Sequence, residues 1–413
     1  MSHPAPTASP RHTAGTSTPD QPSAWAPAAP TIALLTALGV LMVGQMYTVL
    51  ALLHPMATAL GTTPEQVTWT ATAFGFAYAG GFLLAGPLSD RYGSRAVITA
   101  GLVAATAATL AVSAAPDLTW AVALRGVQGL ATATFAPSAL SYAVHHIAPQ
   151  RRGIALTCIT SGMFAAAVLL QIGAQAVAAG LGWRAVFWIS AALMALSLIP
   201  VRRVLRPTLR HDTHTGGGLR QAFAAMPRLL RRPRLVALYL STVVLMSAFV
   251  AVYTAVAIAG PAGVAGNSSA ILALRASVLP ALIAVPVLVP MLQRLAAPLR
   301  TVLAFTLAAL AVAAGSVLGG HTVTLAIALL LFVAAVAAAA PAVVETINAH
   351  APHARGAAVA LYGCSMFIGT SLGPQLTGAL TGLGFGGILR VVAAALILGV
   401  LLALPALRQY RTE

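Results

Sequence analysis

Charge is scarce in this sequence, and lysine is absent from it. Only 7% of the 413 residues are charged, 59% are hydrophobic, and the mean hydropathy is +0.89. A soluble fold of this length needs far more polar surface to cover its core, so a soluble enzyme, a secreted domain and a disordered chain are excluded. Because aromatic residues are few and the apolar runs are long, the pattern favours membrane-spanning helices over the short alternating strands of a β-barrel.

Acidic residues and cysteines are also few. Seven acids stand against 23 basic residues, all of them arginine, and the formal charge is +16. A soluble protein with this charge would be expected to bind nucleic acid, but here the arginines lie between apolar runs, so no nucleic-acid partner is expected. Cys158 and Cys364 lie inside apolar runs and predict neither a disulfide framework nor a CxxC metal site. We expect no metal and no cofactor. Since no G-x-x-x-x-G-K-S/T motif occurs, ATP-driven activity is not expected either.

Apolar runs of about the 20 residues that a bilayer requires follow one another along the chain. Residues 1–29, rich in Pro, Ala, Ser and Thr, are predicted to be a disordered tail rather than a signal peptide, because no basic segment leads into a short apolar core. The twelve predicted spans are residues 30–54, 66–86, 96–115, 118–146, 153–180, 184–201, 235–259, 271–291, 301–319, 322–346, 357–380 and 387–407.

Arginines divide the predicted loops into two sets. Eighteen lie in loops on one side, nine of them between positions 202 and 234, whereas the other side and the spans contain only Arg125, Arg184, Arg275 and Arg390. Cytoplasmic loops are enriched in arginine, and an even number of spans returns the chain to its starting side. Both termini are therefore predicted to be cytoplasmic, in a multi-pass protein of the inner membrane. The arginine-rich loop is expected to contact anionic lipid headgroups.

The two halves of the sequence repeat each other. Residues 148–164 read APQRRGIALTCITSGMF and residues 351–367 read APHARGAAVALYGCSMF, so that the shared Arg-Gly and Met-Phe pairs lie 203 positions apart. Parallel repeats of six helices are found in one large transporter class. The repeat predicts an all-α membrane protein with two six-helix bundles, residues 30–201 and 235–413, joined by a loop at 202–234.

The loop between the second and third spans carries the most informative motif. Residues 86–95 read GPLSDRYGSR. They resemble the signature G-x-L-x-D-R-x-G-R-R/K of the major facilitator superfamily, from which they depart at Ser94. The resemblance implies twelve helices, transport by alternating access, and a loop that latches the halves in the outward-open state.

This loop supplies the predicted gating residues. Gly86 would let helices approach closely, and Gly93 would permit a tight turn. Asp90 can lie against the positive end of a neighbouring helix. Arg91 and Arg95 can donate to that carboxylate or to lipid phosphate.

The fourth span contains an arginine well inside the apolar run. Residues 124–129 read LRGVQG and are similar to the family's R-x-x-Q-G signature, which implies that Arg125 lines the central cavity and orients substrate or a proton carrier. An arginine inside a span is unfavourable by about 2.5–3.5 kcal/mol on insertion scales, so it must face a cavity, water or a partner. The alternative is that Arg125 snorkels toward the outer interface.

Other polar side chains lie at a similar depth. At about 1.5 Å per residue, Gln45, Arg125 and Gln171 lie roughly 10–15 Å below the outer ends of their spans. Gln128 follows one helical turn after Arg125. We expect these residues, with Tyr253 from the second half, to form the substrate site. The alternative is that each amide only joins two helices.

The candidate proton carriers are Asp90, Glu345 at the end of the tenth span, and His54, which can titrate near neutral pH. Glu345 also has a structural interpretation. The repeat places Gln293 opposite Asp90 and retains a basic residue beside it, Arg294. An ion pair between Glu345 and Arg294 is therefore predicted at this end of the second half.

These features together predict a secondary transporter that moves a small molecule, with protons as the coupling ion. The stretch from Tyr47 to position 95 looks like the drug and metabolite efflux branch of the family, which implies export of a drug-like compound or metabolite by a monomer. Ion-coupled uptake and a non-transporting, receptor-like relative are the alternatives. A membrane-embedded enzyme would need acids, histidines or a nucleophile facing one another, and only Arg125 and Glu345 are candidates, at different depths.

Overall fold

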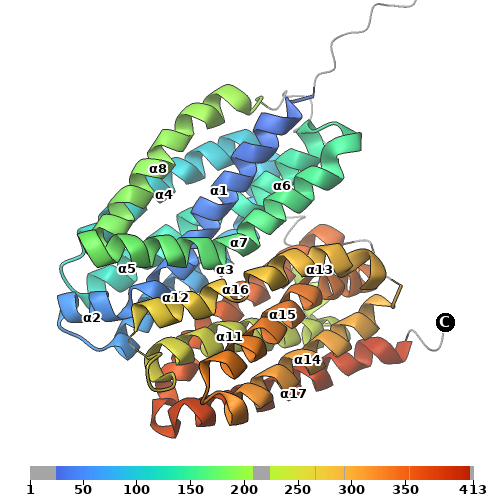
Figure 1. Ribbon diagram of the computed structural model, residues 1–413. Helices are drawn as coiled ribbons and strands as arrows, with labels where there is room; N and C mark the ends of the chain where they lie inside the picture. Colours follow the sequence, from blue (N-terminus) through green and yellow to red (C-terminus); the bar gives the residue numbers. More distant parts are fainter. Residues whose placement is uncertain (1–24, 208–223, 266, 293, 353, 410–413) are drawn as a thin grey trace, which may run out of the picture.

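The computed structural model describes residues 25–207, 224–265, 267–292, 294–352 and 354–409, and these residues form helices joined by short connections (Figure 1). Most of the predicted N-terminal tail and the middle of the loop at 202–234 lie outside the described residues. The first half contains α1 (Ala28–Thr48), the 3₁₀ turn η1 (Val49–Ala51), α2 (Leu53–Leu60), α3 (Pro64–Tyr92), α4 (Ser94–Ser113), α5 (Leu118–Thr132), α6 (Phe135–His146), α7 (Pro149–Leu181) and α8 (Trp183–Val204). The second half contains α10 (Met226–Leu230), α11 (Pro233–Ala259), α12 (Ser268–Ala276), α13 (Leu279–Leu292), α14 (Ala297–Leu318), α15 (Thr322–His350), α16 (Arg355–Ala379), the 3₁₀ turn η3 (Thr381–Leu383) and α17 (Gly384–Gln409).

The twelve-span architecture is confirmed, with three of the spans interrupted. In the described part of the chain, ten helices are long and apolar enough to cross a membrane. The other two predicted spans are each divided, into α5 and α6 and into α12 and α13, and the first span is divided between α1 and α2. A proline lies in the first turn of the helix after each break: Pro55 in α2, Pro137 in α6 and Pro280 in α13. Because proline has no N–H, it cannot bond to the carbonyl four residues earlier, which lies in or beside each break.

The helices form two bundles that follow the order of the sequence. In Figure 1, α1 to α8, coloured blue to green, make one bundle, and α11 to α17, coloured yellow to red, make the other. Each bundle has its own apolar core, with Leu35 and Tyr142 fully buried in the first and Phe305 and Phe332 fully buried in the second. The structure thus has the two six-helix halves that the internal repeat predicts.

The two bundles meet along α3 and α16. Near the start of α3, the side-chain amide of Gln375 donates to the hydroxyl oxygens of Thr68 and Thr72, at 3.0 Å in each case. Deeper in the same interface, the rings of Tyr78 and Phe367 lie 4.1 Å apart between centroids. Polar contacts therefore join the halves near one end of the molecule, and aromatic packing joins them further in.

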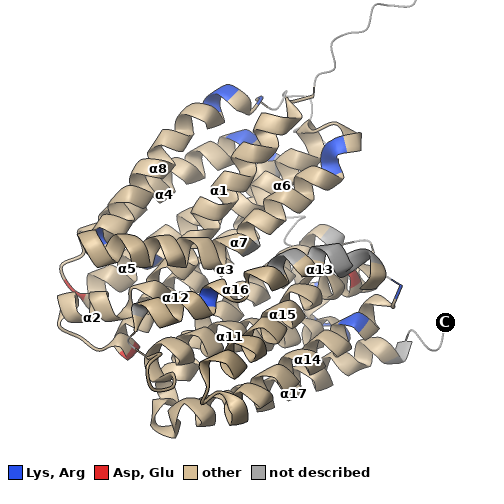
Figure 2. Ribbon diagram, viewed as in Figure 1, with Lys and Arg blue, Asp and Glu red and all other residues tan. Residues whose placement is uncertain are grey.

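The two ends of the molecule differ in charge. We call one end arginine-rich, because most of the described arginines lie there (Figure 2), and the opposite end, which has Glu65 and Asp117, arginine-poor. The two bundles are close together at the arginine-poor end, around α2, α3 and α12, and their helices diverge toward the arginine-rich end (Figure 1). The arginines of the arginine-rich end include Arg91, Arg95, Arg151, Arg152, Arg202, Arg203, Arg232, Arg294 and Arg300.

Glycines set the closest helix contacts. A methyl group at Gly129 of α5 would lie 2.2 Å from the backbone oxygen of Phe74 in α3. In the second half, methyl groups at Gly369 and Gly373 of α16 would lie 2.4 and 2.7 Å from carbonyl oxygens of α11. The close contact predicted at Gly86 is not made in this structure, because a methyl group there would meet no atom within 4 Å. The tight contact between α3 and α5 depends on Gly129.

The predicted ion pair between Glu345 and Arg294 is wrong, because a different arginine is the partner of Glu345. Glu345 of α15 pairs with Arg300, whose side chain is 8% exposed, whereas that of Glu345 is 58% exposed. Arg300 lies in the first turn of α14, which packs against α15, so its side chain reaches the glutamate. Arg294 lies in the turn that precedes α14 and is exposed.

The α3–α5 contact leads to a stability prediction. Gly129→Ala would force a methyl group into the backbone of α3, and such overpacking typically lowers stability by about 1–3 kcal/mol. Gly126→Ala is the matched control, because its methyl group would meet only one atom, at 3.9 Å. Thermal unfolding of the purified variants should show a lower melting temperature (Tm) for Gly129→Ala and an unchanged or higher one for Gly126→Ala. Equal Tm values for the two variants would contradict the tight contact.

The ion pair of the second half leads to another prediction. Glu345→Gln leaves the buried Arg300 without its carboxylate and should lower the Tm, although the exposure of Glu345 limits the loss to about 1 kcal/mol. Arg294→Gln is the control and should leave the Tm unchanged. In a double-mutant cycle, Glu345→Gln with Arg300→Gln should lower stability by less than the sum of the two single changes. Additive losses, or an equal loss in Arg294→Gln, would mean that the pair does not stabilise this end.

Candidate functional site

The arginine of the fourth span lies at the centre of a buried polar network. The helix that positions it, α5, begins after Asp117, whose side-chain oxygen accepts a hydrogen bond from the backbone N–H of Trp120 at 2.9 Å. Arg125 lies two turns further along, with no exposed surface. Its Nη1 donates to Oε1 of Gln128 at 2.7 Å, and its Nε donates to the carbonyl of Thr70 in α3 at 3.4 Å.

The network extends from Gln128 to two further helices. Nε2 of Gln128 donates to Oγ1 of Thr109 in α4 at 2.8 Å and to Oε1 of Gln45 in α1 at 3.2 Å. Gln45 in turn donates to the carbonyl of Leu41 in its own helix, at 3.3 Å. Side chains of α1, α4 and α5 and a carbonyl of α3 are thereby joined. We refer to Gln45, Thr109, Arg125 and Gln128 as the Arg125 network.

An aromatic ring completes the environment of the arginine. The guanidinium carbon of Arg125 lies 4.2 Å from the ring centroid of Phe74, a cation–π arrangement. Its Nη2 has no hydrogen-bond partner among the described residues. The network contains no carboxylate, so it presents one positive charge, one unused donor and several amide groups. This chemistry suits an anionic group or a hydrogen-bond acceptor.

The sequence predicted that Arg125 lines the central cavity, and in this conformation the side chain is fully buried. Arg125, Gln45 and Gln128 are each 0% exposed. The guanidinium is covered by Phe74 and held by a backbone carbonyl, so it neither snorkels nor contacts solvent in this conformation. The side chains come together as the depth argument predicts, but they lie inside the first bundle.

Two predicted substrate residues have no hydrogen bond to this network in the described part of the chain. Gln171 of α7 is buried and donates to the carbonyl of Ala167 in its own helix, while its Oε1 has no partner among the described residues. Tyr253 of α11 is buried in the second half, where its ring packs edge-on against Phe249 at 5.4 Å. Within the described residues, no hydrogen bond joins either residue to the Arg125 network.

The signature loop forms the tight turn between α3 and α4. Gly93 has φ +83°, a conformation that residues with a side chain rarely adopt. Arg91 is exposed and lies over the ring of Tyr92, whereas Arg95 donates to the carbonyl of Arg202 at 2.9 Å. That hydrogen bond lies within the first half. Asp90 lies in the last turn of α3, and its side chain is outside the described part of the structure.

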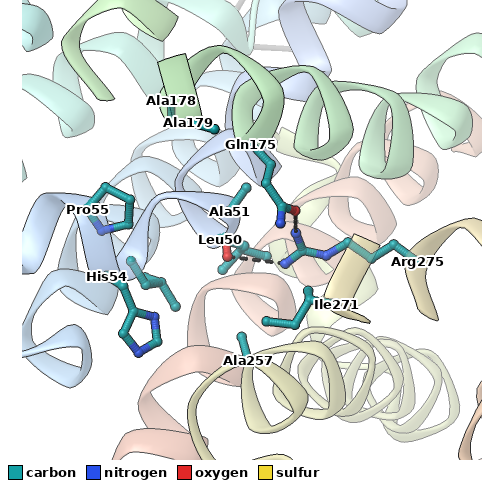
Figure 3. Close-up of a pocket in the computed structure, with 11 residues that line it drawn as sticks. Leu50, Ala51, His54, Pro55, Gln175, Ala178, Ala179, Ala257, Ile271 and Arg275 are labelled. Carbon is teal, nitrogen blue, oxygen red and sulfur yellow. Dashed lines mark hydrogen bonds between the residues drawn. The ribbon is translucent and has the colours of Figure 1, made fainter. Parts of the chain in front are cut away.

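The remaining proton-carrier candidates lie near opposite ends of the molecule. His54, in α2, is exposed and lines a small cavity at the arginine-poor end (Figure 3). Glu345 lies near the arginine-rich end, in its ion pair with Arg300. No interaction in the described residues connects either of them to Arg125.

Sequence reasoning missed three residues that shape these sites. Thr109 belongs to the Arg125 network and Phe74 packs on its guanidinium, but both are ordinary residues of apolar spans, so composition gives no signal for them. Arg275 stands out in sequence only as an arginine away from the arginine-rich loops. In the structure it is 3% exposed and bonds across the two halves, to the Leu50 carbonyl and to Gln175.

The fold is shared with a solved transporter. A peptide transporter in complex with alafosfalin matches with a TM-score of 0.70, over 91% of this chain and 94% of that chain, at 16% identity. A likeness at this identity concerns the fold alone.

Known relatives are similar at the level of sequence. A probable transporter of Streptomyces coelicolor is 29% identical over 380 residues, 90% of this chain and 85% of the relative. The methylenomycin A resistance protein of the same organism is 29% identical over 155 residues, 36% of this chain and 32% of the relative. A multidrug transporter of Aspergillus fumigatus is 28% identical over 157 residues, 38% of this chain and 30% of the relative. The chain thus matches about a third of the length of the last two proteins.

The family follows from a longer match. The sequence model of the Major Facilitator Superfamily covers residues 33–274, which is more than half of the chain. This is a family of transporters, not of enzymes. The chain therefore belongs to the Major Facilitator Superfamily.

Proposed function

We propose that the protein exports a drug-like compound or metabolite across the cytoplasmic membrane by alternating access. The observation that carries this proposal is the unequal contact between the halves. They are joined at the arginine-poor end by α3, α16 and Arg275, and they diverge toward the arginine-rich end. A transporter that rocks two repeats about a central site has such an arrangement as one of its end states.

The charge distribution supports an orientation. Arginine-rich loops remain on the cytoplasmic side, so the arginine-rich end and both termini are proposed to be cytoplasmic. The conformation described here is then open toward the cytoplasm. The arginines around α10 would lie on anionic headgroups of the same leaflet.

The Arg125 network is the proposed polar contact for the substrate. Arg125 has an unused donor and no carboxylate partner in the described residues, so an acceptor group on the substrate would complete its hydrogen bonds. Gln45 and Gln128 would supply further amide contacts. Gln171 and Tyr253 are proposed to approach the same substrate when the halves rearrange.

Export and proton coupling are the finer parts of the proposal. The methylenomycin A resistance protein and the multidrug transporter support the substrate class through their names. Asp90, His54 and Glu345 are the proposed proton carriers, and Glu345 also has its structural pairing with Arg300. The loop with Gly86, Asp90, Arg91, Gly93 and Arg95 is proposed to latch the halves in the opposite, outward-open state.

Transport measurements test the function directly. In a drug-sensitive bacterial host, the full-length chain should raise tolerance to methylenomycin A and lower its accumulation. Everted membrane vesicles should take up the same compound when a proton gradient is imposed, and a protonophore should abolish the uptake. Accumulation that rises in the host would contradict export. Binding of the compound without any counterflow in proteoliposomes would identify a receptor-like relative.

Variants of Arg125 test the proposed contact. Arg125→Lys keeps the charge but loses the planar fork that serves Thr70 and Gln128 together, so transport should fall by roughly tenfold or more, as expected for losing a hydrogen bond to a charged group. Gln45→Ala should weaken apparent affinity by about two- to twelvefold, the equivalent of a single neutral hydrogen bond.

The matched control is Arg184→Lys, since Arg184 also donates to backbone carbonyls, those of Ser113 and Ala115, but outside the network. Its transport should match that of the unaltered protein, with Tm as the folding check. Unimpaired transport by Arg125→Lys, with unchanged affinity in Gln45→Ala, would remove the network from the substrate site.

A further inference from the structure

Arg275 is a second buried arginine, and it lies between the two halves. It occupies the last turn of α12, and its side chain is 97% buried, with 3% exposed. Its Nη2 donates to the carbonyl of Leu50 at 3.3 Å, and its Nη1 donates to Oε1 of Gln175 at 3.4 Å. Both acceptors belong to the first half. Both bonds are long, and Nε has no partner among the described residues.

The charge of Arg275 has no carboxylate to balance it in the described part of the chain. The one ion pair found there joins Arg300 to Glu345, at the arginine-rich end. The two acids of the arginine-poor end have other positions: Asp117 caps α5, and Glu65 lies in the first turn of α3. A buried cation without a counter-charge is strongly unfavourable, so this environment favours an anion beside it.

A cavity of about 120 Å³ lies at this position. Figure 3 shows the Arg275 guanidinium beside Gln175 and the Leu50 carbonyl, with His54 at the other side of the cavity. Small apolar side chains, among them Ala178 and Ala257, form the rest of the wall. The site therefore combines a fork of N–H donors with a narrow apolar lining that limits the size of a ligand.

We propose that this cavity binds a small monovalent carboxylate, with the carboxylate oxygens on the Arg275 guanidinium and the short apolar part against the alanine wall. A planar guanidinium matches the two oxygens of a carboxylate. Because the walls come from both halves, the site is complete only while the halves are together at the arginine-poor end. A ligand that binds this state stabilises it by mass action.

The test measures the Tm of the full-length purified protein at one pH and ionic strength, in sodium acetate or in sodium gluconate. Both anions are carboxylates of the same charge, but gluconate is too long and polar for the cavity. Acetate should raise the Tm by roughly 2–4 °C over gluconate. Equal Tm values in the two salts would overturn the proposal.

Three variants locate the effect. Arg275→Gln should abolish the difference between acetate and gluconate. Ala179→Phe, which leaves every polar group in place and fills the cavity, should abolish it as well. Arg184→Gln changes an arginine at the same end that is already satisfied by two carbonyls, and it should retain the difference. An acetate effect that survives both Arg275→Gln and Ala179→Phe would overturn the proposal.

The carboxylate could be a free solute or part of a transported molecule, and a separate measurement distinguishes these sources. Radiolabelled acetate that binds the protein without accumulating in proteoliposomes identifies a solute that stabilises the closed end. Acetate that accumulates in exchange for unlabelled acetate identifies a carboxylate substrate. Either outcome supports the site, whereas the absence of saturable binding that depends on Arg275 would overturn it.

Discussion

The desolvation of arginine is the constraint on which the two polar sites of this protein depend. A guanidinium that leaves water needs acceptors for its N–H groups, and the spans offer few carboxylates. Arg125 and Arg275 therefore both use backbone carbonyls, those of Thr70 and Leu50, together with the side chain of a glutamine. The Thr70 carbonyl belongs to the same half of the protein as Arg125, whereas the Leu50 carbonyl belongs to the half opposite Arg275. Of these two arginines, only Arg275 therefore bonds across the halves.

Irregular backbone makes one of these acceptors accessible. Leu50 lies in η1, the single 3₁₀ turn between α1 and α2, where hydrogen-bond geometry is poorer than in an α-helix. Pro55 follows this turn and cannot donate to the carbonyl of Ala51. Non-helical backbone at membrane depth is tolerated where it is buried in protein. The break in the first span thus places a carbonyl where an arginine from the opposite half can reach it.

The architecture could be predicted from the sequence because each pattern that indicates it extends over many residues. Twelve apolar runs, an internal offset and a charge asymmetry each involve dozens of positions, so local errors do not alter the outcome. Only the breaks within spans escaped prediction, since a proline can also be accommodated in a continuous helix, as Pro87 and Pro374 are here.

Prediction of the site was less complete because contacts depend on rotation about helix axes. Depth along a span can be counted, and it brought Gln45, Gln128 and Arg125 together correctly. Gln171 has a similar depth, but it donates to the carbonyl of Ala167 in its own helix, and no hydrogen bond in the described residues joins it to the other three side chains. The prediction named Arg294 as the partner of Glu345 where the structure has Arg300, because the sequence did not show that Arg294 lies in the turn before α14 and that Arg300 lies in the first turn of the helix that packs against α15.

The two arginines respond differently to relative motion of the halves. All hydrogen bonds of the Arg125 network lie within the first half, so a rigid-body rotation of one bundle against the other leaves them intact. The bonds of Arg275 cross from α12 to η1 and α7, so the same rotation would break them together. Opening at the arginine-poor end would therefore expose a cation whose acceptors have both moved away, and water or an anion would have to replace them. The free energy of replacing these acceptors would contribute to the equilibrium between the two end states. The hydrogen bonds of the Arg125 network stay the same in both states, so the network would affect this equilibrium only through a ligand that it binds.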